Sequence, residues 1–165
     1  LVVETEAAIQ GGIDFLGGER RVVRWEETPA PLPACPAEVS QSILETQACR
    51  LILLTPAWFE HGYLPEWVRS NYGVKASVEA AVVNRYQTVS GWDYDIQRPK
   101  PTRRLAPAGS VYFLKLQGTP EQRQDFINAV WLKPVSDDAQ SRLDGYGIAV
   151  LGSWNGKLRD MEVKS

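Results

Sequence analysis

Four cations lie close together between residues 97 and 104, in a segment that contains no carboxylate. They are Arg98, Lys100, Arg103 and Arg104. Prolines at positions 99 and 101 remove two backbone N–H groups and hold the chain extended, so the segment cannot fold back to neutralise its own charge. Guanidinium groups are suited to a planar, bidentate grip on phosphate. The segment therefore predicts a surface that binds a polyanion such as nucleic acid.

Neighbouring residues leave alternatives open. A solvated loop that only keeps the protein soluble would carry the same charges, although such a loop has no need of stiffness. Trp92 could stack on an unpaired base. Core packing is the favoured interpretation of Trp92, because chains of this size bury most of their tryptophans and this chain has six. Asp93 and Asp95 have the spacing of metal ligands, but a turn or an ion pair with the nearby arginines is favoured.

Two glycine segments could bring backbone N–H groups close to a phosphate. In the first, Gly145 and Gly147 flank Tyr146, and a tight turn into a strand explains the same residues equally well. In the second, a glycine pair at 17 and 18 precedes Arg20 and Arg21. A turn is expected there if a strand begins at Arg21, with a second basic contact if both arginines face one surface.

Catalytic and metal-binding patterns are scarce. His61 is the only histidine and could act as a general acid or base against a ribose 2′-hydroxyl, but it has no visible catalytic partner. Cys35 and Cys49 lie fourteen positions apart without a CxxC motif, so two free thiols are favoured over a disulfide, zinc or redox site. A P-loop and the usual nucleophile motifs are missing. The sequence therefore favours binding over catalysis and predicts no cofactor and no metal.

The elements that must position these residues follow from apolar periodicity. Residues 21–27 predict a strand and residues 28–36, rich in proline, a connector. A helix should begin near Pro36, with Val39, Ile43 and Leu44 on one side. Residues 49–54 form an almost unbroken apolar run, which predicts an interior strand covered on both faces.

Later elements follow from the same patterns. Residues 74–83 alternate and predict a half-exposed strand with Val74, Ala76, Val78, Ala80 and Val82 on one face. Residues 110–116 predict a further strand, and residues 119–122 a helix-capping box. The helix should bury Phe126, Ile127, Val130 and Trp131, and residues 146–151 should form the last strand. The order predicts an α+β protein with a ferredoxin-like βαββαβ pattern and an elaborated central β-hairpin.

Composition limits the function classes. With 165 residues and 44% apolar content, the chain can form one domain that buries about two thirds of its unfolded surface. A net charge of −2 argues against a general nucleic-acid coat protein and indicates that the basic character is confined to one face. No apolar run approaches the length of a membrane span and no leader pattern opens the chain, so we expect a cytoplasmic protein.

A family resemblance is carried by GWD…RPKPTRR…PAGSVYF, over residues 91–113. This stretch resembles a signature of the RAMP superfamily, in particular the third subunit of the type III-B CRISPR effector, the Cmr module. Residues 16–21, 53–65 and 144–152 fit the same family in the same order. Each motif alone is weak, but four in order are a strong signal.

The resemblance implies a ferredoxin-like (RRM-like) RAMP domain without catalytic activity, which holds the 5′ handle of the CRISPR RNA in antiviral defence. Its implied partners are this RNA, a large cyclase-like subunit and the backbone RAMP subunits. Some RAMP relatives cleave precursor RNA with a histidine, so a metal-independent endoribonuclease is one alternative. A protein scaffold whose basic loop meets an acidic neighbouring protein is another. Family members are longer than this chain, which opens at Leu1 and has Met161 as its only methionine. We therefore expect residues 1–165 to be a single domain from the C-terminal part of a longer subunit.

The resemblance also completes the set of predicted RNA-binding residues, because it adds two positions from PAGSVYF and favours RNA contact for the glycine segment at residues 145–147. The set comprises Arg20, Arg21, Trp92, Arg98, Lys100, Arg103, Arg104, Gly109, Ser110, Gly145, Tyr146 and Gly147.

Overall fold

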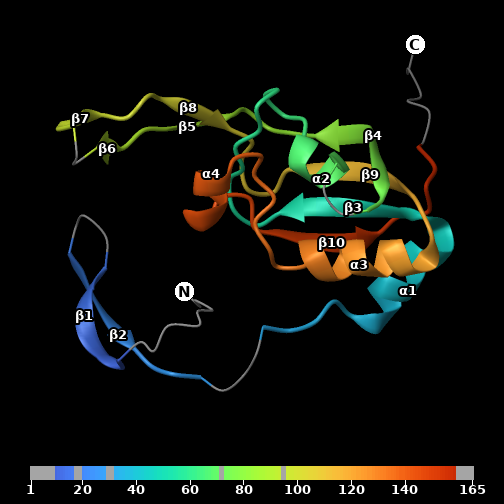
Figure 1. The fold of residues 1–165 in the computed structure, drawn as a ribbon, viewed down its shortest axis with the longest axis horizontal. Helices are drawn as coiled ribbons and strands as arrows, with labels where there is room; N and C mark the ends of the chain where they lie inside the picture. The colour runs from blue at the N-terminus through green and yellow to red at the C-terminus, as the bar shows by residue number, and fades with distance from the viewer. Residues whose placement is uncertain (1–9, 17–19, 29–31, 71–72, 94–95, 159–165) are drawn as a thin grey trace, which may run out of the picture. The chain divides into compact units, whose positions relative to one another are not determined.

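The computed structural model describes residues 10–16, 20–28, 32–70, 73–93 and 96–158 (Figure 1). The chain divides into two compact units, Leu1–Pro33 and Ala34–Ser165, and each is described by itself. The expectation of one domain over residues 1–165 stays a prediction. None of the helices in the described ranges combines the length and apolar character that crossing a membrane requires.

The first unit contains an antiparallel hairpin of β1 (Gly12–Leu16) and β2 (Arg21–Trp25). The strand predicted from residue 21 is therefore present. It pairs with β1, however, and is not a strand of the main sheet. Local β propensity predicts that a segment is extended, but the choice of partner depends on residues elsewhere in the chain.

The second unit is built on a four-stranded antiparallel sheet with the order β10-β3-β9-β4. The strands are β3 (Ala48–Leu53), β4 (Lys75–Val82), β9 (Val111–Gln117) and β10 (Ala149–Ser153). Helices α1 (Ala37–Thr46) and α3 (Pro120–Val130) pack against each other and against β10, as Figure 1 shows. Two shorter helices are α2 (Glu66–Ser70) and α4 (Ala139–Leu143). The predicted α+β class is confirmed.

Strand directions reveal two crossover units. Because β3 and β4 are both antiparallel to β9, which lies between them, they run parallel to each other. By the same argument β9 and β10 are parallel, with β3 between them. The connection from β3 to β4 carries α2, and the connection from β9 to β10 carries α3. Each parallel pair is thus linked through a helix and separated by one inserted strand.

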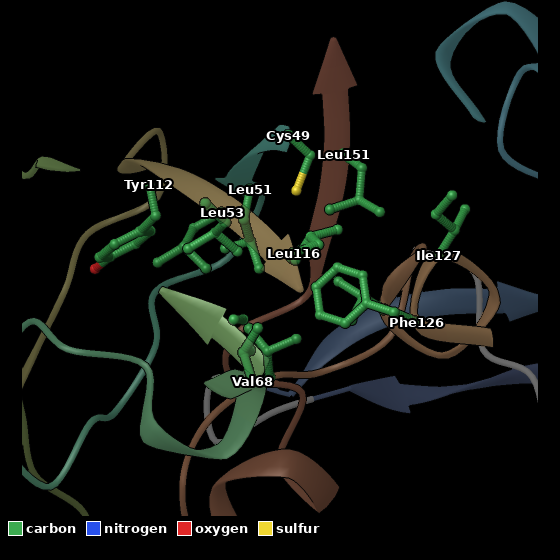
Figure 2. Packing of buried hydrophobic residues seen from close by; sticks show 14 of the residues in the cluster. Cys49, Leu51, Leu53, Val68, Tyr112, Leu116, Phe126, Ile127 and Leu151 are labelled. Carbon is green, nitrogen blue, oxygen red and sulfur yellow. The ribbon is translucent and has the colours of Figure 1, made fainter. Parts of the chain in front are cut away.

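The core lies between one face of this sheet and the helices. Cys49, Leu51 and Leu53 of β3 point into it together with Phe126 and Ile127 of α3, as Figure 2 shows. The prediction that β3 is an interior strand is confirmed by its pairing with both β10 and β9. The expectation that both its faces are covered is wrong, because Arg50 on the other face is exposed.

The alternation predicted for β4 holds only in its first half. Ala76 and Val78 pair with Leu116 and Leu114 on the core face, but the register shifts between Val78 and Ala80. A β-bulge places an extra residue in one strand and reverses which side chains face inward. Val82 is therefore 59% exposed, contrary to the prediction, whereas Val83 packs against the core.

The two long helices agree with their sequence signals. Helix α1 begins directly after Pro36 and buries Ile43, with Val39 and Leu44 packed against the core. Helix α3 begins with the predicted capping box: Gln122 N donates to Thr119 Oγ1 at 3.3 Å, and Thr119 N donates to Gln122 Oε1 at 2.8 Å. Its predicted stripe is buried except for Trp131, which is partly buried at the end of the helix.

Candidate nucleic-acid interface

The predicted central hairpin is present as an arm, residues 87–105, inserted between β4 and β9. Its inner ladder pairs β5 (Gln87–Val89) with β8 (Arg103–Leu105). Its outer ladder pairs β6 (Trp92–Asp93) with β7 (Arg98–Pro99). In Figure 1 both ladders extend beyond the four-stranded sheet. The arm is a two-stranded ribbon, so most of its side chains have no core to pack against.

Arg98 and Lys100 lie on the exposed outer part of the arm. The backbone there is held by a hydrogen bond from Lys100 N to the Gly91 carbonyl at 2.7 Å and one from Ser90 Oγ to the Lys100 carbonyl at 2.9 Å. Within the part of the chain that the structure describes, neither cationic side chain forms an ion pair. Both charges are therefore available to an external anion.

Aromatic side chains accompany the cations of the arm. Trp92 is 46% exposed, so the favoured interpretation that it packs in the core is wrong. Its backbone pairs with Pro99 in the outer ladder. The Arg104 guanidinium lies over the Tyr86 ring, 4.7 Å from its centroid, and this ring is also exposed. Alternating cations and exposed rings are the composition of a surface for single-stranded nucleic acid.

Sequence reasoning missed Arg85 and Tyr86, which lie exposed where the arm begins. Their signal was available, because a hairpin predicted around the basic segment needs a second strand before it. Thr88 pairs with Arg104, so the residues just before β5 necessarily lie near Arg104. Pairing the basic segment with residues 85–90 at the sequence level would have identified both.

Arg103 differs from the other three cations because it contacts residues outside the arm. The part of the second unit that lies outside the arm is called the body below. Its Nη1 lies 3.1 Å from Asp138 Oδ2 and donates to Ser141 Oγ at 3.3 Å. Its guanidinium also lies over the Trp58 ring, 4.8 Å from the centroid. Partial burial raises the pKa of Asp138, but hydrogen bonds from Ser141 and the charge of Arg103 outweigh this and lower that pKa overall.

The glycine segment at residues 145–147 forms a turn between α4 and β10, so the last strand starts at Ala149, three residues later than predicted. Gly145 and Gly147 have φ of 80° and 88°, a region that favours glycine. The amides of residues 144–148 all donate within the chain, for example Gly147 N to the Pro56 carbonyl at 2.8 Å and Ile148 N to Thr55 Oγ1 at 2.9 Å. In this conformation the turn has no free N–H to offer a phosphate.

Gly109 and Ser110 occupy a turn that leads into β9. Gly109 N donates to the Leu53 carbonyl at 2.7 Å, and the buried Ser110 Oγ donates to the Pro107 carbonyl at 2.7 Å. These contacts join the base of the arm to the end of β3. Ser110 is only 1% exposed, so in this conformation its hydroxyl is not accessible to an external ligand.

Arg20 and Arg21 belong to the first unit. Both are exposed; Arg20 has φ of 51° and its guanidinium lies over the Phe15 ring at 4.6 Å from the centroid. Arg21 is the first residue of β2 and pairs with Leu16. The predicted turn before Arg21 falls on residues 17–19, which lie outside the described residues.

The remaining candidates are the histidine, the two aspartates and the two cysteines that the sequence analysis considered for catalysis or metal binding. His61 is exposed in a tight turn, where its carbonyl accepts a hydrogen bond from Tyr63 N at 3.1 Å. Asp93 Oδ1 accepts from Ile96 N at 3.3 Å, which fits the predicted turn, while Asp95 lies outside the described residues. No group of three or more potential metal ligands gathers in the described ranges. Cys35 and Cys49 are free thiols, as predicted.

Comparison with known proteins agrees with the resemblance found in the motifs. The sequence matches the family model described as CRISPR-associated protein (Cas_Cmr3) over residues 1–154. No curated protein matches the sequence significantly. The family match covers nearly the whole chain, including the arm and every predicted site residue. The chain therefore belongs to the Cas_Cmr3 family of CRISPR-associated proteins, the third subunit of the type III-B Cmr effector complex.

Proposed function

We propose that this chain is a non-catalytic, RNA-binding subunit that holds the 5′ repeat-derived handle of the CRISPR RNA. The observation that carries the proposal is the arm, on which Arg98, Lys100 and Arg104 are exposed beside the exposed rings of Trp92 and Tyr86. Cations satisfy the phosphates and rings stack on unpaired bases, which together suit a single-stranded RNA end.

The fold supports the same proposal. Two parallel strand pairs, each linked by a helix and split by an inserted strand, are the arrangement of a ferredoxin-like domain, the fold implied for RAMP proteins. Within this plan the core βαββαβ elements are β3, α2, β4, β9, α3 and β10, and the arm is an elaboration between β4 and β9. An elaboration of this kind can acquire binding residues without disturbing the core.

The predicted RNA-binding residues take different roles in this proposal. Arg98, Lys100, Arg104 and Trp92 contact RNA directly, and Arg20 and Arg21 supply a second basic contact. Gly109, Ser110 and the turn at 145–147 do not contact RNA directly. They stabilise the fold that carries the arm, through the hydrogen bonds that they make within it. Their N–H groups would contact phosphate only after a rearrangement of these turns.

Docking to other subunits is assigned to the first unit. Ile13, Phe15 and Val22 lie on one side of the β1–β2 hairpin, since Phe15 pairs with Val22, and all three are exposed. A two-stranded hairpin is marginally stable by itself, and an apolar side on it favours burial against a neighbour. We propose that this side contacts a neighbouring subunit of the complex, either the large cyclase-like subunit or a backbone RAMP subunit.

Salt-dependent binding tests the role of the arm. Replacing Arg98, Lys100 and Arg104 together by glutamine should reduce the slope of log affinity against log salt by about 0.7 for each lost phosphate contact. A matched control replaces the exposed Arg50, Lys75 and Lys157 by glutamine, which changes the net charge equally away from the arm. Handle RNA and a scrambled RNA of equal length are compared by anisotropy. Equal slopes for the two variants would refute the arm as the contact.

The absence of catalysis is part of the proposal and has its own test. The alternative, a metal-independent endoribonuclease, requires a general acid or base, and His61 is the one histidine in the chain. We expect precursor RNA incubated with the chain in chelator to remain intact, and His61→Ala to make no difference. Cleavage that disappears in His61→Ala would establish the nuclease instead.

A further inference from the structure

We propose that Arg103 is a positioning residue, which fastens the base of the arm to the body of its unit rather than contacting RNA. This inference rests on the proposed function for its RNA measurements, but not for its measurement on the free protein. Charge alone predicts RNA contact for Arg103 and for the other three cations of the segment, but the surroundings of Arg103 are different.

Strand alternation separates Arg103 from its neighbour in β8. Successive side chains of a strand point to opposite faces, so residues 103 and 105 share one face and residue 104 has the other. Leu105 is buried, whereas Arg104 lies over the exposed Tyr86 ring. Arg103 shares the face of Leu105, and contacts Asp138, Ser141 and Trp58 while 48% of its side chain remains exposed.

The residues of the body that contact Arg103 are themselves held by hydrogen bonds. Asp138 is the N-cap of α4, and its Oδ1 accepts a hydrogen bond from Ser141 N at 2.9 Å while Oδ2 faces Arg103. Trp58 N donates to Ser136 Oγ at 3.1 Å, and the Trp58 carbonyl accepts from Asp137 N at 3.0 Å. The acid and the ring that contact Arg103 are thus connected to each other through adjacent residues.

The arm needs such an anchor because little else holds it. At its base, Ala106 exchanges two backbone hydrogen bonds with Ala57, of 2.8 and 2.9 Å, and Leu105 is buried. Beyond this point the inner ladder has three residue pairs and the outer ladder two. A short two-stranded ribbon is marginal by itself. An arm free to swing would lose conformational freedom on binding RNA, which weakens affinity.

The substitution Asp138→Asn distinguishes positioning from direct contact. Asparagine is as good an N-cap as aspartate, so α4 is retained, but the charge that holds Arg103 is lost. If Arg103 contacted phosphate, removing its competing carboxylate would tighten RNA binding. Under the proposal, Asp138→Asn weakens binding of handle RNA by up to about fivefold, the effect of losing one ion pair, without changing the salt slope.

The matched control is Asp144→Asn. It also removes one negative charge, near the other end of α4, where Asp144 Oδ1 accepts from Gln140 Nε2 and does not contact Arg103. We expect this variant to bind handle RNA as tightly as the parent or slightly more tightly. Tighter binding by Asp138→Asn than by Asp144→Asn would overturn the proposal, and so would a salt slope reduced by Arg103→Gln as much as by Arg98→Gln.

Hydrogen exchange on the RNA-free protein completes the test. Amides of β5 and β8 should exchange several-fold faster in Arg103→Gln and Asp138→Asn than in the parent or Asp144→Asn. Amides of β3 and β9 should be unchanged, which verifies that the fold is intact. Unaltered exchange in the arm would overturn the proposal even if RNA binding fell. Faster exchange in a protein that fails to bind RNA at all would support the positioning role and refute the proposed function.

Discussion

Cations of equal charge have different surroundings in this protein because the backbone turns their side chains in different directions. Arg98 and Lys100 project from the outer arm, and Arg104 lies over an exposed ring. Arg103, one residue before, is engaged by Asp138. An exposed ion pair contributes at most about 1 kcal/mol to stability, so the importance of this pair lies in orientation more than in overall stability.

Trp92 is the residue whose exposure changes a functional expectation. We predict that Trp92→Ala weakens handle-RNA binding by about 1 to 3 kcal/mol through lost stacking on a base. The melting temperature should stay within about 1 °C of the parent, because the ring contributes little to the core. Anisotropy and thermal unfolding measure the two effects. Trp131→Ala is the control: this ring packs against the core, so its loss should lower the melting temperature.

The two thiols should differ in reactivity. Burial, with a smaller effect from Cys35, raises the pKa of Cys49 far above its usual range, and burial raises the pKa of Cys35 as well. Because the thiolate is the reactive form and a raised pKa removes it at pH 8, Cys49 should resist alkylation in the native protein. Half-exposed Cys35 should react slowly, and faster as the pH rises toward its pKa.

Mass spectrometry after iodoacetamide treatment, with and without denaturant, measures this difference. Cys35→Ser provides the control, since it leaves Cys49 as the only thiol. Labelling of Cys49 in native buffer at the rate of Cys35 would contradict its burial.

At the scale of elements, the turn before β10 depends on two glycines in different ways. Both have positive φ, but a Cβ on Gly147 would lie 2.8 Å from Ser136 N, whereas one on Gly145 would meet open space. Backbone atoms of a neighbouring segment cannot move aside as a flexible side chain can. The turn is therefore a packed connection between residues far apart in the sequence.

Alanine substitutions should separate these two effects. We predict that Gly147→Ala lowers the free energy of unfolding by about 2 to 4 kcal/mol, from backbone strain and the clash together. Gly145→Ala should lower it by about 1 to 2 kcal/mol, since only the strain applies. Urea denaturation monitored by tryptophan fluorescence measures both. Equal losses would mean that the contact with Ser136 is not maintained.

Element prediction succeeded for the two long helices, whose signals are local, and missed the short helices α2 and α4. The capping box, the proline at the helix start and the apolar stripe of α3 all act within one or two turns, and the helix forms where they indicate. Alternation in β4 failed at the bulge, because the pairing with β9 decides the register there. The strand at residue 21 formed as predicted, but its partner could not be inferred from its own residues.

At the scale of the whole molecule, the hydrophobic core is contained in the second unit. The buried cluster and the residues packed against it extend from Cys35 to Leu151. The described residues of the first unit contribute none of its members. The exposed apolar side of the β1–β2 hairpin adds nothing to this core in the described residues, which agrees with the proposal that it contacts another subunit.

A shortened chain of residues 34–165 tests this division. We predict that it unfolds cooperatively with a melting temperature within a few degrees of the whole chain, because it retains all the core residues. Handle-RNA binding through the arm should persist, with a smaller salt slope if Arg20 and Arg21 contact RNA. Differential scanning calorimetry provides the measurement. Failure to fold would show that the first unit is required for the core.

The sequence alone determined the two long helices and where each begins, the α+β class, the charge of the arm and, through four ordered motifs, the family. These features depend on residues within a few positions of one another or on their linear order. Only the tertiary structure decided that Trp92 is exposed, that the amides of the glycine turn are already bonded, and that Arg103 faces Asp138, thirty-five residues away. Each of these depends on which distant segment the folded chain places beside the residue, and no local pattern records that choice.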